Sequence, residues 1–470
     1  MENKTKGQTL LEQLSFTPQN AYDDASAFDT AEMQKYADGY IDFLSEAKTE
    51  REAVQYAVAM AEKHGYHSHR LGEPLHAGGK YYYNNRDKSL FLFTLGEEPL
   101  TSGVAIAAAH IDSPRLDLKQ HPVYTDNGIA YFKTHYYGGI KKYQWTTIPL
   151  ALHGTVVRAD QSRVDICLGE DPSDPVLYIS DLLPHLGKDQ MAKKMADGIT
   201  GEQLNLITST SPYADEKNSP LSLDQRIKLN LLHLLHEKYQ ITEGDLMSAE
   251  LCAVPAGRAR YIGFDRSLIG GYGHDDRICA YTALTALFAT EQSKKTRMVV
   301  LADKEEIGSV GNTGMQTSLF DDLLDEIAAF GHMTGAQLRA ASKCLSADVG
   351  AAFDPNFPEV YEKNNSAFLN RGVVMCKFTG SRGKAGSSDA SAEFVGEIRA
   401  AFDRAGVVWQ TSELGKVDQG GGGTVAAYIA NRNIDVLDLG VPLLSMHSPL
   451  EVAAVADLYQ THLAFTALYT

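Results

Sequence analysis

The sequence predicts an α/β fold with a largely parallel sheet, interrupted by a mainly β segment. Short apolar runs bounded by polar residues, VAIAAAH at residues 104–110 and RMVVLAD at residues 297–303, are typical of strands buried on both faces. Helical patterns lie between such runs, notably at residues 279–292 and 388–406. This alternation of strands and helices predicts a three-layer α/β/α arrangement.

Other segments of the chain extend this pattern. Residues 30–63 mix apolar and charged side chains and predict a leading pair of helices. The runs KCLSADVG (343–350) and IDVLDLGVPLLSMH (434–447) repeat the strand pattern. The residues that follow, SPLE (448–451), match a capping box with proline at the first helical position. We therefore expect a helix to begin directly after His447.

The segment from Leu116 to Ala256 breaks the alternation. Asn127-Gly128 predicts a tight hairpin turn between β-rich flanks, and residues 146–157 and 164–170 are β-rich as well. A helix is expected at residues 229–238. At 470 residues the chain exceeds the roughly 250–300 residues at which one core stops growing. We expect a discontinuous domain formed by residues 1–118 and 257–470, and an inserted β-rich domain formed by residues 119–256.

The composition excludes several classes of protein. No segment approaches the ~20 apolar residues needed to cross a bilayer, and the N-terminus lacks the basic and apolar regions of a secretory signal. We therefore expect a cytoplasmic protein with no membrane partner. A net charge of −17 without a basic stripe argues against nucleic acid as a partner. The five cysteines contain no CxxC pair, which argues against a thiolate zinc site.

Paired carboxylates, Glu305 and Glu306, follow one of the predicted buried strands. At a strand end, neighbouring side chains point in different directions, so one could bind a metal while the other faces a reactant. Such a pair alone is more often a solvated turn. The metal hypothesis depends on four other places where a ligand-type residue ends an apolar run or precedes a helix: His110, Asp275 or Asp276, Asp348 and His447.

These residues supply two imidazoles and three carboxylates, with one glutamate left over. Asp112 lies two residues after His110, on the same face of an extended backbone, where it could fix the tautomer of the imidazole. Asp275 and Asp276 precede a helix, where carboxylates are also favoured as caps. A ligand set without sulfur suits zinc, cobalt or manganese, and two such ions ~3.5–4 Å apart can polarise a carbonyl together.

Four sequence segments resemble the aspartyl aminopeptidase family of metallopeptidases, particularly its bacterial branch. The segments HIDSPRLDLK, DKEEIGS, LSADVG and VPLLSMHSPLE occur in the family's order, between about His110 and Glu451. The resemblance implies an α/β/α catalytic domain of the zinc-peptidase type, interrupted by a β-rich dimerisation or assembly domain. It also implies a large homo-oligomer, commonly a dodecamer.

The resemblance also implies a role for each matched residue. One metal, zinc by the resemblance, would be held by His110 and Asp348, and a second by Glu306 and His447. Asp275 would bridge the two ions, Glu305 would be the general base, and Asp112 would orient His110. Two substrate-side residues are weaker matches: His185 in LLPHL, which would reach the site of a neighbouring subunit, and Lys377 in VVMCKF.

Two short motifs depart from the family pattern. Ile111 stands where the aspartyl branch usually has threonine, and GHDDR (273–277) replaces the family's usual LDN-type motif around the bridging aspartate. The ligand set survives both changes. The choice of Asp275 over Asp276 rests on the alignment, and a preference for acidic N-terminal residues does not follow.

The leading hypothesis is a metal-dependent aminopeptidase that hydrolyses the first bond of peptides with a free N-terminus. A hydroxide bridging two metals would attack the peptide bond, with Glu305 as the base. One alternative is a two-metal amidase or deacylase of N-acyl amino acids, because the ligand set alone does not define the substrate. Another is a non-enzymatic self-assembling scaffold, although the complete ligand set argues against it.

Overall fold

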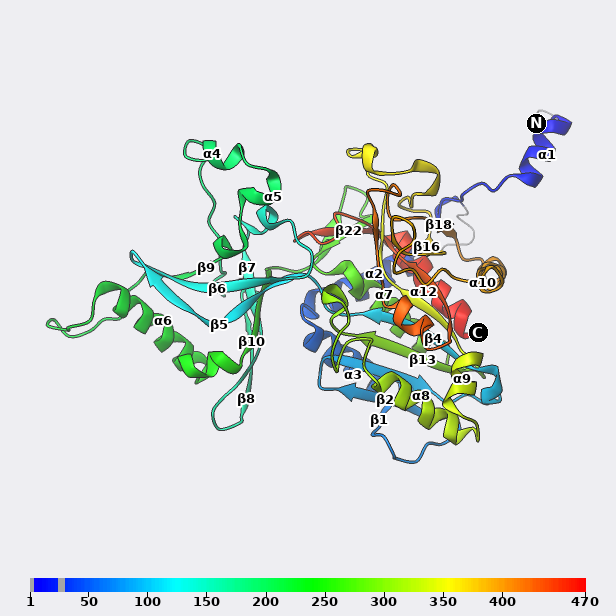
Figure 1. Cartoon of the computed structure of the whole chain (residues 1–470), viewed down its shortest axis with the longest axis horizontal. Coiled ribbons are helices and arrows are strands. Elements are labelled where there is room, and N and C mark those ends of the chain that lie inside the picture. The colour runs from blue at the N-terminus through cyan, green and yellow to red at the C-terminus, as the bar shows by residue number, and fades with distance from the viewer. Residues whose placement is uncertain (1–3, 24–29) are drawn as a thin grey trace.

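The computed structural model describes residues 4–23 and 30–470. Figure 1 shows two parts side by side, a large sheet with helices on both faces and a smaller sheet with a helix of its own. Helix α1 (Lys6–Leu14) stands away from both parts. None of the helices in these ranges is long and apolar enough to cross a membrane. The predicted three-layer α/β/α architecture is confirmed in the larger part.

The large sheet has nine strands in the order β1-β2-β3-β13-β4-β14-β20-β16-β18. Its four central strands, β13, β4, β14 and β20, are parallel, as predicted. The strands are β1 (His67–Ser68), β2 (Lys80–Asn85), β3 (Ser89–Thr94), β4 (Val104–His110), β13 (Thr296–Ala302), β14 (Lys343–Ala347), β16 (Val373–Cys376), β18 (Trp409–Thr411) and β20 (Asp435–Gly440).

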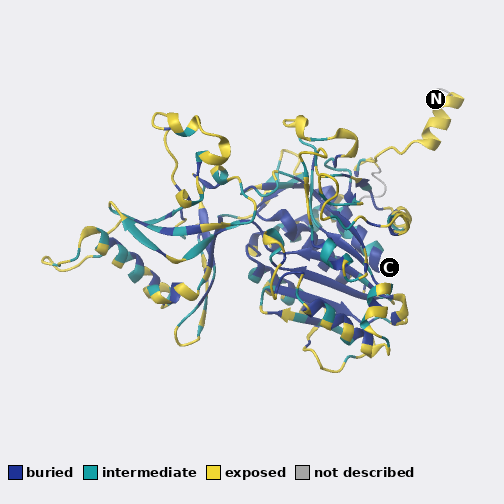
Figure 2. Ribbon diagram, in the orientation of Figure 1, coloured by how far each residue is buried: buried dark blue, intermediate teal, exposed yellow. Residues whose placement is uncertain are grey.

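Helices cover both faces of this sheet, because successive residues of its strands point to opposite sides and both sides are apolar. One face carries α2 (Thr30–Glu46), α3 (Glu50–Lys63), α7 (His274–Ala289), α10 (Ala392–Ala405) and α12 (Val455–Tyr469). The other carries α8 (Leu319–Phe330), α9 (Gly335–Ala341) and α11 (Ala426–Ala430). Figure 2 shows the buried strands between them. The predicted leading helix pair is α2 and α3.

The second part is an antiparallel sheet of six strands in the order β8-β7-β10-β5-β6-β9. Its strands are β5 (Arg115–Asp126), β6 (Ile129–Tyr137), β7 (Leu150–Val157), β8 (Arg163–Leu168), β9 (Leu206–Ser209) and β10 (Glu250–Pro255). Short helices α4 (Lys188–Met191) and α5 (Met195–Gly198) lie between β8 and β9. The predicted Asn127-Gly128 turn joins β5 to β6, with positive φ at both residues.

Helix α6 (Leu223–Tyr239) packs on the six-stranded sheet and begins six residues before the predicted helix. The reason is a capping box in which Ser222 and Gln225 satisfy each other's backbone N–H groups. The sheet has a hydrophobic core of its own. The predicted limits of the inserted domain, residues 119 and 256, fall inside β5 and just after β10. The division into two domains stays a prediction.

A five-stranded sheet has the order β11-β12-β22-β21-β15, and its strands β15 and β21 directly follow β14 and β20 of the large sheet in the chain. It consists of β11 (Arg260–Ile262), β12 (Leu268–Gly271), β15 (Gly350–Ala351), β21 (Pro442–Leu444) and β22 (Glu451–Ala454). The prediction of a helix directly after His447 is therefore wrong. Glu451 pairs with β12, and its carboxylate accepts the backbone N–H groups of His447 and Asp275 instead of capping a helix. Helix α12 begins only at Val455.

A partly buried ion network joins the six-stranded sheet to α3. His153 on β7 lies 2.7 Å from the Glu52 carboxylate on α3 and 3.0 Å from that of Glu170. Lys48 lies 3.3 Å from Glu170 and donates to the carbonyl of Pro255. Burial by itself would lower the pKa of His153, but Cys167 and the two glutamates raise it to about 11. The imidazole is therefore charged at neutral pH and holds the two parts together.

Candidate active site

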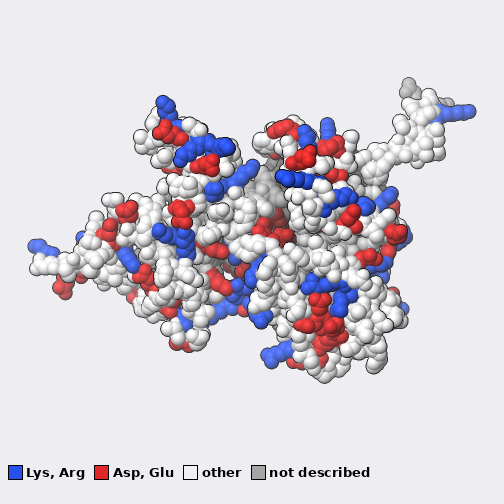
Figure 3. Space-filling model, in the orientation of Figure 1, with Lys and Arg blue, Asp and Glu red and all other residues white. Residues whose placement is uncertain are grey.

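The candidate residues meet where the parallel strands of the large sheet end. His110 is the last residue of β4, Glu305 and Glu306 form a short turn after β13, and Asp348 follows β14. Carboxyl ends of parallel strands share one edge of a sheet, so residues far apart in sequence come together there. Asp275 at the start of α7 and His447 after β21 complete the group. Figure 3 shows acidic side chains in a hollow between the two parts.

Asp275 lies between the two imidazoles. Its Oδ1 is 3.1 Å from Nε2 of His110, and its Oδ2 is 3.1 Å from Nε2 of His447. The carboxylate of Asp276 is buried and makes no hydrogen bond with any described residue. Of the two aspartates that the sequence left as candidates, Asp275 has the position of a bridge.

The other carboxylates surround the same imidazoles. Glu306 Oε1 lies 3.2 Å from Nε2 of His447, and Asp348 Oδ1 lies 3.9 Å from Nε2 of His110. Glu305 Oε2 is 4.0 Å from the same His110 nitrogen. Two sets of possible metal ligands result, namely His110, Glu305 and Asp348, and His110, Asp275 and Glu306, each with its ligand atoms within 4.8 Å of one another.

This donor set fits divalent cations such as zinc. It combines imidazole nitrogens with carboxylate oxygens and contains no thiolate. Asp275 Oδ1 and Glu306 Oε1 are buried and make no hydrogen bond within residues 4–23 and 30–470. Buried carboxylate oxygens without partners are costly, and a bound cation satisfies them.

Asp112 acts through its main chain and its side chain. Its backbone carbonyl accepts from Nδ1 of His110 at 3.0 Å, whereas its carboxylate is farther from that nitrogen, at 3.4 Å. A carbonyl can only accept, so Nδ1 donates this hydrogen bond, and Nε2 is the nitrogen that faces the site. The carboxylate instead accepts the backbone N–H groups of Glu305 at 3.0 Å and Glu306 at 3.2 Å. The orienting role of Asp112 stays a prediction, and its carboxylate also holds the backbone of the paired glutamates.

His447 is oriented in the same way. Its Nδ1 donates to the carbonyl of Gly139 at 2.8 Å, which leaves Nε2 facing Asp275 and Glu306. Its backbone N–H donates to Glu451 at 2.7 Å. Both imidazoles therefore present the nitrogen that a metal would need.

The crowded carboxylates shift one another's protonation. Burial raises the pKa of Glu305 to about 8, with Asp348 and Glu306 adding to the effect and His110 opposing it. Burial and Asp275 raise the pKa of Glu306 to about 7. Burial alone would raise the pKa of Asp275, but the two histidines hold it below its usual value. Carboxylates crowded together in this way repel one another when charged, and a bound cation would relieve that repulsion.

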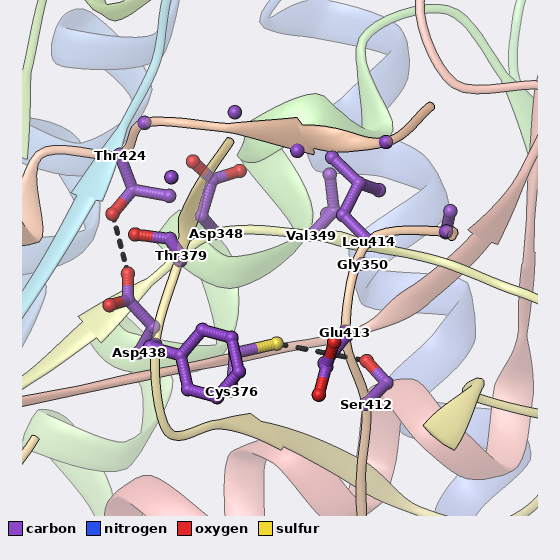
Figure 4. A pocket seen from close by; sticks show the side chains of 18 of the residues that line it. Asp348, Val349, Gly350, Cys376, Thr379, Ser412, Glu413, Leu414, Thr424 and Asp438 are labelled. Atoms are coloured by element: carbon purple, nitrogen blue, oxygen red, sulfur yellow. Dashed lines mark hydrogen bonds between the residues drawn. The ribbon is translucent and has the colours of Figure 1, made fainter. Parts of the chain in front are cut away.

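A cavity of about 630 Å³ opens onto this cluster. Its walls come from residues 348–351 and from parts of the segments 376–384 and 412–424 (Figure 4). In Figure 4, the Thr424 hydroxyl donates to Asp438 at 2.5 Å, and Cys376 Sγ lies 3.7 Å from Ser412 Oγ. The glycine run at residues 420–423 lines the cavity, so backbone can approach a ligand closely there.

Two predicted substrate-side residues lie outside this cavity. Lys377 is not among its described lining residues, and its ammonium pairs with Asp389 at 2.8 Å, although Cys376 and Phe378 on either side line the wall. His185 is exposed in the segment between β8 and β9 and does not reach the site of its own chain. Sequence reasoning missed Tyr137, Gly139 and the role of Glu451. The pattern YGG after a β-rich run was the available signal for the first two.

Comparison with known families agrees with the geometry. The model of the aminopeptidase I zinc metalloprotease family (M18) matches residues 43–469. The chain belongs to the M18 family. It is a metal-dependent aminopeptidase, and the predicted family resemblance and enzyme class are confirmed. Membership favours this activity over the deacylase and scaffold alternatives.

Relatives and solved structures match almost the whole chain. The probable M18 family aminopeptidase 1 of Clostridium acetobutylicum is 48% identical, over 95% of this chain and 97% of its own. The M18 family aminopeptidase structure from Thermotoga maritima has a TM-score of 0.91 at 40% identity and covers 97% of this chain and 99% of its own. The yeast mApe1 dodecamer shares the fold, with a TM-score of 0.74 at 23% identity, over 93% of this chain and 96% of its own.

Proposed function

We propose that this M18 aminopeptidase removes the first residue of peptides with a free N-terminus, using two divalent cations. His110 and Asp348 would hold one ion, Glu306 and His447 the other, and Asp275 both. The position of Asp275 supports this most directly, because its two oxygens each lie 3.1 Å from Nε2 of a different histidine. When bound, such ions polarise the scissile carbonyl and lower the pKa of the attacking water.

Glu305 is the proposed general base. Its side chain lines the cavity beside the ligands, and its backbone N–H is held by Asp112. The carboxylate takes a proton from the attacking water at Oε and delivers it to the leaving amine. The surrounding carboxylates attract the positively charged α-amino group of the substrate. The side chain of the substrate's first residue enters the cavity between Val349, Cys376 and Leu414.

Removal of metal is expected to abolish activity reversibly. Protein stripped of metal with a chelator should release no p-nitroaniline from a panel of aminoacyl-p-nitroanilides. Reloading with zinc, cobalt or manganese should restore the release, because the cations polarise the carbonyl of the scissile bond. The same panel with acylated amines is the control. Release of the acyl group from blocked substrates, together with inactivity on free ones, would favour the deacylase instead.

We also propose a large homo-oligomer, a dodecamer like the yeast relative. Residues 182–195, between β8 and β9, expose five large apolar side chains in a single chain, which is typical of a surface covered by a partner: Leu182, Leu183, Leu186, Met191 and Met195. His185 lies within this segment and is the candidate that reaches a neighbouring site.

Light scattering tests the assembly. We expect a mass several times that of one chain, 51.3 kDa, and a Leu186→Glu variant that dissociates, because a charge placed in an apolar interface is costly. Lys188→Glu, a charge change on the same segment, is the control. A wild type that stays monomeric at micromolar concentration would contradict the proposal.

A further inference from the structure

Three consecutive residues, the last of β6 and the two that follow it, contact residues of the candidate metal site, although β6 belongs to the six-stranded sheet. Tyr137, Gly138 and Gly139 face Asp112, Glu306 and His447, in that order. We propose that this segment is a positioning element for the metal ligands, so that the centre is built partly by the six-stranded sheet. The inference rests on the proposed function for the identity of the ligands.

Tyr137 supports the paired glutamates through Asp112. Its hydroxyl donates to Asp112 Oδ2 at 2.8 Å, and the same carboxylate accepts the backbone N–H groups of Glu305 and Glu306. Asp112 is fully buried, so no water replaces a lost partner easily. Tyr137 therefore holds the Asp112 carboxylate in place, and Asp112 holds the backbone of Glu305, the proposed base.

Arg115 holds the ring of Tyr137 in place. Its guanidinium lies 4.2 Å from the centre of the ring and pairs with Glu50 on α3 at 2.7 Å. The phenol is thus fixed on one side by a cation that is itself anchored to the larger part. The position of its hydroxyl depends on packing between the two parts, and a phenylalanine would keep that packing.

Gly138 and Gly139 leave room for the ligands. Gly138 has a φ of +73°, and a Cβ added there would lie 3.3 Å from both Cβ and Oε2 of Glu306. A Cβ added at Gly139 would lie 3.4 Å from Nδ1 of His447, whose proton goes to the Gly139 carbonyl. The backbone of this segment therefore packs directly on Glu306 and His447, the two side chains proposed to hold the second metal.

Tyr137→Phe and Gly138→Ala test the proposal against matched controls on the same strand pair. Tyr136→Phe removes a hydroxyl from the neighbouring, more exposed ring, and Gly128→Ala introduces a side chain at a φ of +86° with nothing within 4 Å. Zinc affinity is measured by competition with a chromophoric chelator, and kcat and KM with an aminoacyl-p-nitroanilide. Light scattering and thermal unfolding show whether each variant is folded and assembled.

We expect Tyr137→Phe to lower kcat by roughly tenfold or more while KM changes by less than about twofold, since the hydroxyl orients the base and does not touch the substrate. Gly138→Ala should weaken zinc binding by roughly 10–100-fold. Both controls should match the wild type. A Tyr137→Phe variant with kcat within about twofold of wild type, or equal losses in both tyrosine variants, would overturn the proposal.

The zinc measurement separates this inference from the proposed function. If the wild type binds zinc without hydrolysing any substrate, the proposed function fails, yet weaker zinc binding in Gly138→Ala than in Gly128→Ala still supports the positioning element. Equal zinc affinity in these two variants overturns it. If Gly138→Ala does not fold, the proposal is tested by the zinc affinity and kcat of Tyr137→Phe, compared with those of Tyr136→Phe.

Discussion

Replacing Glu305 by glutamine is expected to reduce kcat by roughly 10²–10⁴-fold, the range that a positioned acid or base contributes. Glutamine keeps the size of the side chain and the backbone N–H that Asp112 holds, but it cannot take a proton from water. KM should change little, because the lost interaction belongs to the transition state. The measurement is steady-state hydrolysis by zinc-loaded protein at matched metal occupancy.

Metal occupancy distinguishes a base from a ligand at this position. Glu305 groups with His110 and Asp348 as possible ligands of one ion, so its carboxylate could also bind the ion proposed for those two residues. Glu306→Gln is the matched control, since it changes the neighbouring carboxylate that faces His447. Zinc should stay bound in Glu305→Gln and be weakened in Glu306→Gln. Equal zinc loss in both variants would make Glu305 a ligand and remove it as the base.

Asp275→Asn is expected to have the second large effect, the loss of tight metal binding and of activity together. The carboxylate lies between both histidines, and asparagine takes away both the negative charge and one of the two acceptor oxygens. The loss of zinc affinity should exceed the roughly 10–100-fold that outer partners of a metal site cost. Zinc content and chelator competition measure it directly.

Asp276→Asn is the control for the neighbouring aspartate. Burial raises the pKa of Asp276 well above its usual value, and Asp275, not Asp276, is the aspartate whose oxygens face the two imidazoles. Asparagine has nearly the same shape, and zinc affinity should stay close to that of the wild type. A larger loss in Asp276→Asn than in Asp275→Asn would reverse the assignment of the bridge.

The local sequence was sufficient to predict the strands that carry the site. VAIAAAH and RMVVLAD are apolar on both faces, and such runs can be buried only in a sheet covered on both sides, which is where β4 and β13 lie. The ends of these strands then placed His110 and the paired glutamates at one edge. The choice of ligands depended further on the family's order of motifs, because a lone histidine or aspartate pair has many structural uses.

Local patterns failed where a side chain has a distant partner. SPLE has the pattern of a helix start, but Glu451 instead accepts backbone N–H groups from His447 and from Asp275, which is 176 residues away in the chain. The extended pairing of β22 with β12 follows from this tertiary contact. A short capping pattern is worth about 1 kcal/mol, which pairing with a neighbouring strand can outweigh.

The sequence by itself determined the α/β/α architecture, the family and the set of candidate ligands, because these depend on residue type, periodicity and order. The family resemblance favoured Asp275 over Asp276 without a physical reason, and the tertiary structure supplied one, since only Asp275 lies between the two imidazoles. It also brought Tyr137 and Gly139 to the site from a different sheet. Those contacts join residues far apart in the chain, and their geometry depends on how the two sheets pack.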